Sequence, residues 1–468
     1  MTQHTKVHAF GDDALADHDA TAVAELIKTK KLSVHDVVDA VIQRAAKVNP
    51  ILHAIQEDCF EPQRKTPEFR LNRMFSGVPF FFKDNVDVKG LKSQQGSHAF
   101  QAKTAQKNWQ ITEQILDQGL WVLGKSKMPE FGLNASTEFQ DGTAVPNPWH
   151  TAYSCGASSG GAAALVASGV VPMAHANDGG GSIRIPAAAC GLVGLKPSRG
   201  RFKEDAARFL PINIISEGVL TRSVRDTANF FYGMEQTYSS QLKPMGQVQG
   251  ATKRRLRIGV IEQSITGTID LETRTTLWQT AELLQDLGHH VSTTTLPIAD
   301  SFVDDFSHYW GSLSYMMAHG GKVLFDPSFE KQKLDSLTCG LANVYQKNIW
   351  KTPFFIHRLK QVEAEYHAAF QHFDVVLSPV LAHTTPEIGY LSPQLHFDEL
   401  FARIQNYVTF TPIHNVAGAP ALSLPMGQTS VDQRPIGMMF SADIGDEKTL
   451  LELAFELEQA QPWHRIQD

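Results

Sequence analysis

The amino-acid sequence predicts a large α/β protein, and three observations support this prediction. Helix-like and strand-like segments alternate along much of the 468 residues, as in proteins whose helices pack on a sheet. The composition, 42% apolar and 19% charged, is ordinary for a globular protein and excludes wholesale disorder. Ten of the 34 glycines fall within residues 156–200, which predicts tight turns or a close approach of backbone to a ligand.

The first 70 residues are predicted to be mainly helical. Ser33 with Asp36 resembles a capping box. Apolar residues then recur at helical spacing up to Ala45. The pair Asn49-Pro50 is expected to end this helix, because proline resists helix continuation.

Strands and helices alternate in the sequence that follows. Residues 78–82, Val-Pro-Phe-Phe-Phe, predict a buried strand that ends in Lys83-Asp84-Asn85. A polar linker or long surface loop is expected at 236–252. The other elements predicted by the pattern are a helix at 111–118, strands at 120–123, 256–261 and near 290–291, and helices at 275–287 and 449–458.

Charge and cysteine content argue against several classes of protein. The net charge is −7, and the densest basic cluster, Lys253 to Arg257, is short and lacks interleaved aromatic residues. We therefore expect a solvated linker there and no nucleic-acid partner. The four cysteines have no CxxC spacing, which favours a reducing compartment. The N-terminus has no apolar signal segment, and the longest apolar stretch, 162–174, is too short and broken to span a bilayer.

These features predict a cytoplasmic protein with no membrane partner. The sequence contains no HExxH motif and no cluster of cysteine and histidine ligands, so neither a metal nor a cofactor is expected.

Three motifs are candidates for the catalytic or binding site. The first, residues 119–126, fits the phosphate-binding pattern GxxxxGK[ST]. A phosphate-binding loop needs a strand before the first glycine and a helix directly after the lysine. Here a helix-like segment comes first, strand-like residues 120–123 take the place of the loop, and Met128-Pro129 resists a helix. The order of elements therefore argues against nucleotide binding.

The second motif, residues 156–160, fits the GxSxG nucleophile elbow of α/β-hydrolases. Residues 161–165 can start a helix, as the elbow requires, but residues 151–155 are not a convincing core strand. The motif alone leaves two interpretations open. One is an esterase with its nucleophile at Ser158, and the other is a glycine-rich helix start without chemistry.

The third motif places three consecutive glycines before a serine: Gly179, Gly180, Gly181 and Ser182. The backbone N–H groups of such glycines are unobstructed beside a hydroxyl, which is what an oxyanion hole requires. A tight turn whose serine hydrogen-bonds locally is the alternative. We expect Asp178 and Arg184 to brace the turn rather than contact substrate. His175 is expected to be a plain packed or exposed histidine, not a member of a Ser-His-Asp triad.

Together the second and third motifs resemble the defining block of the amidase signature family. The resemblance rests on Ser158-Ser159-Gly160-Gly161, on Ser182 in Gly-Gly-Ser-Ile-Arg 24 residues later, and on residues 190–198, Cys-Gly-Leu-Val-Gly-Leu-Lys-Pro-Ser. It is loose between residues 300 and 400 and otherwise covers most of the chain, including segments 49–54, 77–85, 124–131, 146–149, 220–226 and 415–421.

This resemblance implies a three-layer α/β/α sandwich around a large mixed β-sheet. It implies a single amidase domain over residues 1–468, made of an N-terminal helical segment (1–70), a catalytic core (71–235) with the signature block, and the remaining sheet and substrate-pocket elements (236–468). Lys83 matches the catalytic lysine, Ser158 the bridging serine and Ser182 the nucleophile. In the family the bridging serine follows a cis peptide bond, here Ala157–Ser158, although the common Gly-Gly-Ser-Ser has become Gly-Ala-Ser-Ser.

A Lys–Ser–Ser relay suits the hydrolysis of an amide, which is a poor electrophile. Neutral Lys83 can accept a proton from Ser158. Ser158 in turn accepts a proton from Ser182 when Ser182 attacks the amide and forms an acyl-enzyme. A lysine that is neutral at pH 7 needs a lowered pKa, which burial beside the phenylalanines at 80–82 would supply. The glycine N–H groups and that of Ser182 would hold the oxyanion.

Four functions stay open: a stand-alone amidase, an esterase that uses Ser158, a binding protein on an amidase scaffold, and the amidase subunit of a tRNA-dependent amidotransferase. The block at 178–182 and the ending Gln461-Pro462-Trp463 look closer to stand-alone bacterial amidases, including those that hydrolyse aminohexanoate cyclic dimers. We expect a small-molecule amide substrate and a monomer or homodimer. Aromatic residues expected near an apolar pocket are Phe131, Phe306, Tyr309, Trp310, Tyr315, Phe401 and Tyr407.

Overall fold

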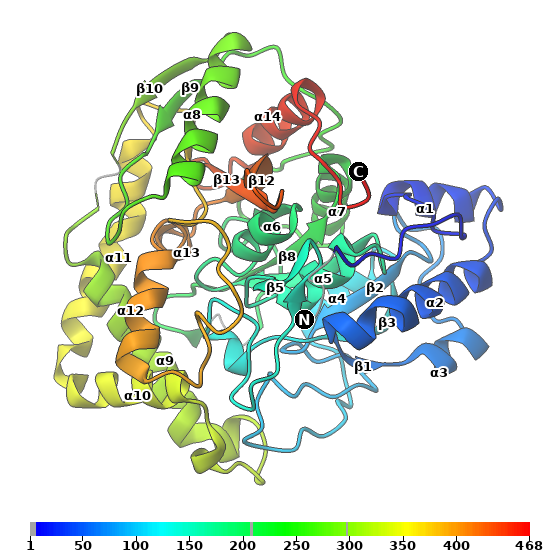
Figure 1. The fold of residues 1–468 in the computed structure, drawn as a ribbon, viewed down its shortest axis with the longest axis horizontal. Coiled ribbons are helices and arrows are strands. Elements are labelled where there is room, and N and C mark those ends of the chain that lie inside the picture. Colours follow the sequence, from blue (N-terminus) through cyan, green and yellow to red (C-terminus); the bar gives the residue numbers. More distant parts are fainter. Residues whose placement is uncertain (1–5, 206–208, 296–297) are drawn as a thin grey trace.

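The structure, a computed structural model, describes residues 6–205, 209–295 and 298–468 and is centred on an eight-stranded mixed sheet (Figure 1). The strand order is β10-β9-β11-β13-β12-β7-β8-β6. Strand β9 pairs in parallel with β10 and β11, and the other neighbouring pairs are antiparallel. The bounds are β6 Met173–Asp178, β7 Val193–Lys196, β8 Ser216–Thr221, β9 Arg257–Val260, β10 His290–Thr293, β11 Val375–Pro379, β12 Ala421–Gln428 and β13 Pro435–Ser441.

A second sheet of three strands, in the order β1-β3-β2, lies against β6 of the large sheet. Strand β2 (Pro79–Lys83) runs parallel to β3 (Trp121–Ser126), and β1 (Ile55–Asp58) is antiparallel to β3. Every residue of β2 and β3 is buried, as expected of apolar strands covered on both faces. A separate two-stranded ribbon joins β4 (Pro146–Asn147) to β5 (His150–Ser154).

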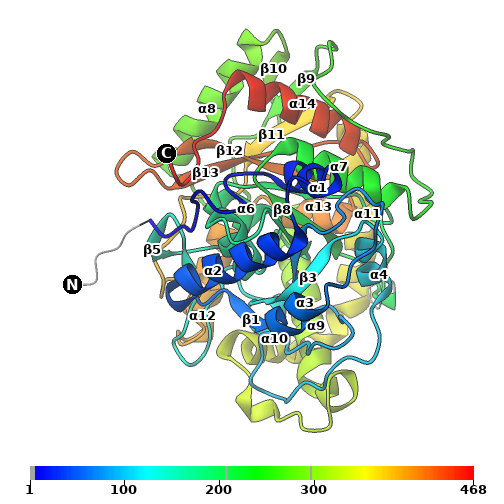
Figure 2. The same ribbon diagram turned by 90° about the vertical axis from the view of Figure 1, so that its right-hand side faces the viewer.

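Helices cover both faces of the large sheet, which confirms the predicted α/β architecture around a large mixed sheet. In Figure 2, α8 and α14 lie above β11, β12 and β13, while α6 and α13 lie below them. Helix α7 packs on β7 and β8, and α5 packs on β6 and β2. These helices are α5 Gly160–Ala167, α6 Arg184–Cys190, α7 Val224–Glu235, α8 Leu271–Asp286, α13 Pro412–Ala417 and α14 Glu447–Ala460.

The remaining helices form two flanks beside these layers (Figure 1). The N-terminal flank consists of α1 Ala20–Lys28, α2 Val34–Leu52, α3 Phe60–Lys65 and α4 Gln110–Leu116. The other flank consists of α9 Phe302–Leu324, α10 Ser336–Lys347, α11 Thr352–Ala369 and α12 Phe397–Tyr407. Single 3-10 turns occur at η1 Glu130–Gly132, η3 Lys331–Lys333 and η4 Ile349–Lys351.

Two details of the N-terminal segment differ from the sequence prediction. Helix α2 begins after Ser33, whose side chain accepts from the N–H of Asp36 as predicted, but it runs through Pro50 to Leu52. Pro50 lies in the last turn, where its missing N–H and its ring disturb the helix little, and the helix ends at His53 in the left-handed conformation. The segment also contributes strand β1, which the helical pattern did not predict.

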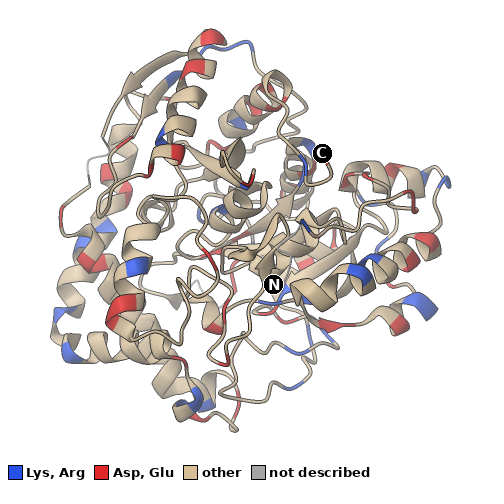
Figure 3. Cartoon of the chain, in the orientation of Figure 1, with Lys and Arg blue, Asp and Glu red and all other residues tan. Residues whose placement is uncertain are grey.

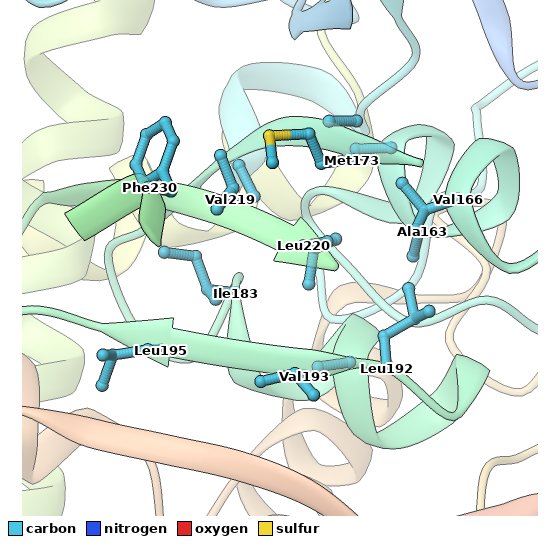
Figure 4. Close-up of a cluster of buried hydrophobic side chains, with 14 of the residues drawn as sticks. Ala163, Val166, Met173, Ile183, Leu192, Val193, Leu195, Val219, Leu220 and Phe230 are labelled. Atoms are coloured by element: carbon cyan, nitrogen blue, oxygen red, sulfur yellow. The ribbon is translucent and has the colours of Figure 1, made fainter. Parts of the chain in front are cut away.

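The core beside the signature block places the serine turn directly on the sheet. Figure 4 shows the Ile183 side chain between β7 and β8. A Cβ at Gly218 would lie 3.0 Å from Ile183 Cδ1, and one at Gly194 would lie 3.1 Å from Ile183 Cγ2. The two glycines therefore leave the space that Ile183 fills, and this packing anchors the residue next to Ser182.

Charged residues occur mainly on the outer helices and loops, with both signs interspersed (Figure 3). In the basic cluster predicted to be a linker, Arg254 and Arg257 pair with Asp374, and Arg255 pairs with Glu456. Residues 236–252 contain neither helix nor strand, as predicted. Among the described residues, no helix combines the length and apolar character needed to cross a membrane.

Candidate active site

Strand β2 carries Lys83 to a buried position between the two sheets. Its side chain is 1% exposed, and Phe80, Phe81 and Phe82 on the same strand are fully buried. Lys83 Nζ lies 2.7 Å from Ser158 Oγ. Burial lowers the pKa of Lys83 to about 7, while the carboxylates of Glu217 and Asp178 act in the opposite direction. The environment expected from the sequence is therefore present around the amine.

Ser158 lies two residues before the start of α5 and is 2% exposed. The Ala157–Ser158 peptide bond is cis, as the family resemblance implied. The η1 turn closes over the serine, because a Cβ at Gly132 would lie 2.9 Å from Ser158 Oγ, and Gly132 has φ +70°. The segment at 124–131 that resembles the family thus leads into a turn that contacts Ser158.

Asn177 is a member of the site that sequence reasoning missed. Lys83 Nζ donates to Asn177 Oδ1 at 2.7 Å and contacts its backbone oxygen at 3.3 Å. Asn85 exchanges two side-chain hydrogen bonds with Asn177, at 3.1 and 3.2 Å. The available signal was position, since Asn177 lies two residues before the first glycine of the motif and Asn85 follows Lys83 by two residues.

Asp178 and Arg184 brace the glycine turn from within, as predicted. The Asp178 carboxylate accepts from the N–H groups of Gly181 and Ile183 at 2.7 and 3.1 Å. Arg184 donates two hydrogen bonds to the same carboxylate, both at 2.9 Å, and both side chains are 0% exposed. Burial alone would raise the pKa of Asp178, but Arg184, with Lys196 and Asn415, holds that pKa well below its usual range.

The bond from Gly181 removes one donor from the predicted oxyanion set. Its N–H is directed at Asp178, whereas Gly179, Gly180 and Ser182 use no backbone N–H in a hydrogen bond to another described residue. Gly181 instead serves the turn through its conformation. It has φ +139°, and a Cβ there would lie 2.5 Å from Thr411 Oγ1.

A distant segment completes the brace. Asn415 Nδ2 donates to the backbone oxygen of Asp178 at 2.8 Å and to that of Ile214 at 2.9 Å, and its Oδ1 accepts from Arg184 at 2.7 Å. Thr411 Oγ1 donates to Gly180 O at 2.5 Å. Asn415 opens a segment that resembles the family, but only the fold reveals its role.

Ser182 opens onto the cavity that contains the site. It is half-buried, and its hydroxyl makes no hydrogen bond with another described residue. In particular, no hydrogen bond joins the Ser158 and Ser182 hydroxyls. Of the contacts that the predicted relay requires, the structure therefore contains the one between Lys83 and Ser158 but not the one between Ser158 and Ser182. Fully buried His175 lies beneath Lys83 as a packed histidine.

The cavity has a volume of about 940 Å³ and a largely apolar wall. Of the aromatic residues expected there, Phe131, Phe306 and Trp310 line it. Tyr309 and Tyr407 are instead buried in the core, and Tyr315 and Phe401 pack against that core. The prediction was wrong for these four because spacing along α9 and α12 does not show which face meets the cavity.

The phosphate-binding pattern and the residues before the GxSxG pattern have other structural roles. Residues 121–126 form β3, and Lys125 is fully buried, with Nζ 2.7 Å from Val86 O and 3.2 Å from Lys92 O. A lysine held in this way cannot reach a phosphate, as the order of elements predicted. The residues before the GxSxG pattern form β5 of the small ribbon, not a strand of the large sheet.

Comparisons with known proteins agree with this geometry. The family model described as Amidase matches residues 36–451. The putative amidase AmiC of Mycobacterium tuberculosis is 47% identical over 467 residues, which cover 99% of this chain and 98% of that protein. The 6-aminohexanoate-cyclic-dimer hydrolase of Paenarthrobacter ureafaciens is 31% identical over 484 residues, 95% of each chain.

A solved structure of 6-aminohexanoate cyclic dimer hydrolase complexed with substrate has a TM-score of 0.85 to this fold at 28% identity, and covers 96% of this chain and 98% of its own. The family model spans well over half of the sequence, and the alignments with the two relatives cover 99% and 95% of this chain. The chain therefore belongs to the amidase signature family, a family of hydrolases that act on the C–N bonds of amides.

Proposed function

We propose that this chain hydrolyses a small-molecule carboxylic amide through an acyl-enzyme on Ser182, with Lys83 and Ser158 relaying the protons. The main support is the 2.7 Å contact between Lys83 Nζ and Ser158 Oγ. A pKa of about 7 leaves much of Lys83 neutral at neutral pH, so the amine has a lone pair for the serine proton. Ser158 is then the hydroxyl through which the lysine acts on the nucleophile.

The steps of the reaction follow from these positions. Ser182 Oγ attacks the amide carbon and passes its proton to Ser158, whose own proton moves to Lys83. The proton returns to the amide nitrogen as the C–N bond breaks and the amine leaves. Water then attacks the acyl-enzyme by the same relay and releases the acid. The Ser182 hydroxyl must turn toward Ser158 when substrate binds, a tightening that is common between free and substrate-bound enzymes.

The oxyanion is assigned to the N–H groups of Gly179, Gly180 and Ser182. These donors are the ones that the turn leaves without a partner in the described protein. The third glycine, Gly181, keeps its role in shaping the turn. Preorganised donors of this kind act most strongly where water is excluded, and the turn is rigidly held from behind by the Asp178–Arg184 pair.

The wall of the cavity indicates an amide with a bulky apolar group. Phe131, Phe306 and Trp310 line it together with aliphatic residues of α9 and α12. A volume of about 940 Å³ is at the upper end of small-molecule sites. We therefore expect aryl, long alkyl or cyclic amides to be better substrates than glutamine, which the amidotransferase-subunit alternative requires.

The contacts of Ser158 argue against an esterase of the α/β-hydrolase kind. Its hydroxyl contacts Lys83 Nζ, whereas that mechanism needs a histidine ring at the nucleophile. A binding protein on an amidase scaffold is disfavoured because Lys83, Ser158 and Ser182 are all present.

Covalent labelling and turnover test the proposal. The purified chain alone is assayed with glutamine and with aryl, alkyl and cyclic amides, and a fluorophosphonate is used to label the reactive serine. We expect the label on Ser182, and neither label nor turnover in Ser182→Ala. A label on Ser158, or turnover in Ser182→Ala close to that of the parent, would overturn the assignment. Activity confined to glutamine would favour the amidotransferase subunit instead.

A further inference from the structure

A fully buried histidine lies directly beneath the proposed catalytic lysine. His175 is on β6, and its Nδ1 accepts a hydrogen bond from the backbone N–H of Lys83 at 3.2 Å. Its ring packs against that of Phe82, with ring centroids 5.3 Å apart. The mechanism proposed above gives this ring no chemical step, so its position needs another explanation.

The hydrogen bonds fix the tautomer of the ring. The backbone N–H of Lys83 can only donate, so Nδ1 is the acceptor and the proton of the neutral ring is on Nε2. That Nε2–H donates to Glu217 Oε2 at 2.9 Å. Burial lowers the pKa of His175, although Glu217 acts in the opposite direction, so the ring is neutral near pH 7. A single chain of hydrogen bonds thus runs from Glu217 through His175 to the backbone of Lys83.

Glu217 occupies a distinctive place on the cavity wall. It lies on β8, where it pairs with Asn177, the residue that accepts from Lys83 Nζ. Its side chain is 15% exposed, and it lines the same cavity as Ser182. Its carboxylate therefore faces substrate space on one side and holds the histidine on the other.

We propose that His175 and Glu217 form a positioning pair for Lys83, in which the ring fixes the end of β2 and the carboxylate fixes the ring and supplies negative charge behind the lysine. The inference rests on the proposed function, because it assigns the pair to the lysine of that mechanism. Neither residue exchanges a proton with the substrate. Both act through Lys83, which they hold within reach of Ser158.

Charge makes the role of Glu217 measurable. Its carboxylate is the stronger of the two charges that raise the pKa of Lys83 against burial, ahead of Asp178. Activity needs the neutral amine, so it rises with pH through the pKa of Lys83. Removal of the Glu217 charge lowers that pKa and shifts the acid side of the pH profile to lower pH. The other charged groups around the pair are Asp178 and Lys125. A substitution of Glu217 leaves both of these side chains in place.

Glu217→Gln tests the charge while it keeps an acceptor for His175. We expect the acid limb of kcat/KM, measured with a neutral aryl amide, to shift to lower pH by roughly half a unit or more. A purely structural role would lower activity at every pH without moving the limb. An unmoved limb therefore overturns the assignment to Glu217.

Two substitutions at His175 separate its two hydrogen bonds. Asparagine places an acceptor near the position of Nδ1, so His175→Asn keeps support for the Lys83 N–H but loses the link to Glu217. Glutamine reaches the position of Nε2, so His175→Gln keeps a donor to Glu217 but leaves that N–H unpaired. We expect kcat to fall at least tenfold further in His175→Gln than in His175→Asn, with a smaller change in KM. Equal kcat values in variants of equal thermal stability overturn the positioning role.

The failure of this inference can be told apart from failure of the proposed function. Fluorophosphonate labelling of Ser182 in the parent chain, together with inactivity of Lys83→Ala, establishes the relay independently of the pair. Suppose that both of these results are obtained, but the Glu217→Gln and His175 variants lose activity only in proportion to their loss of stability. In that case only the assignment of the positioning pair is wrong. If Lys83→Ala turns over at near the parental rate, the relay itself is wrong, and the pair falls with it.

Discussion

Lys83 and Lys125 lie on neighbouring strands of one small sheet, where Phe82 of β2 pairs with Lys125 of β3. Both side chains are buried, and burial lowers the pKa of each, to about 7 for Lys83 and about 8 for Lys125. Their partners differ. Lys83 Nζ meets a serine hydroxyl and an asparagine side chain, whereas Lys125 Nζ meets two backbone carbonyls and Ser93.

This difference shows why burial alone does not identify a catalytic lysine. Backbone carbonyls only accept, and Ser93 already donates its own proton to Val86 O at 3.0 Å, so these partners hold Lys125 as a donor. Among the described residues, the Ser158 hydroxyl forms a hydrogen bond only with Lys83 Nζ, so its proton is not committed to a carbonyl. Lys196 makes the same point: burial lowers its pKa to about 7, but its Nζ binds Pro197 O and Ser216 Oγ, and that hydroxyl donates to Pro197 O at 3.3 Å.

The largest expected effect comes from replacing each lysine by methionine. Lys83→Met removes the proton acceptor, and we expect kcat/KM to fall on the order of 10⁴-fold. Lys125→Met removes an equally buried amine outside the relay, and we expect the folded fraction to keep activity within about tenfold. Steady-state kinetics with one aryl amide, normalised to folded protein, compare the two. Equal losses would show that the distinction between their partners is wrong.

Asp178→Asn extends the comparison to a buried anion with a structural partner. The change leaves the fully buried Arg184 without its counter-charge, and we expect the free energy of unfolding to fall by about 3–5 kcal/mol. Urea unfolding followed by tryptophan fluorescence measures it. Asp19→Asn is the matched control, since the Arg225 side chain of its ion pair is 52% exposed, and we expect a loss of about 1 kcal/mol or less. Similar losses in the two variants would contradict a central brace.

The pH dependence of activity sharpens the same contrast. Lys83 must be neutral to accept a proton, and its pKa is about 7. We therefore expect kcat/KM to fall about tenfold per pH unit well below pH 7 and to level off above it. Lys125→Met should leave this limb in place, because Lys125 is not the titrating group. A flat profile between pH 5 and 8 would exclude Lys83 as the base.

Much of the site was predictable because its residues are close in sequence or belong to one motif. Ser158, Ser182 and the Asp178–Arg184 brace all lie within the glycine-rich block, and Lys83 ends a strand whose apolar run is plain. Asn177 was missed because its position beside the glycine motif does not show that its side chain meets Lys83, 94 residues away in the sequence. Asn415 reaches Asp178 across 237 residues, a contact that depends on how β6 and α13 come together.

The alternation of helices and strands likewise predicted the fold class, but not every boundary. The end of α2 was misjudged because a proline in the last turn is tolerated where one in the middle is not. The sequence did not distinguish Gly181 from the two glycines before it, because three consecutive glycines look alike in sequence. Only the structure shows that the Gly181 N–H is directed at Asp178.

The smallest expected effect concerns the cavity wall, where no charge is involved. Trp310→Ala enlarges the apolar pocket, and we expect kcat/KM for a bulky aryl amide to fall about tenfold, since a lost apolar contact of this size costs about 1–3 kcal/mol. Activity on a short alkyl amide that does not reach Trp310 should change little. Phe401→Ala is the control, because Phe401 packs against the core behind the wall and does not line the cavity. If the ratio of kcat/KM values for the two amides is the same in the parent and in Trp310→Ala, the substrate binds elsewhere in the cavity. The contrast between Lys83 and Lys125 would then stand without any claim about an apolar group of the substrate.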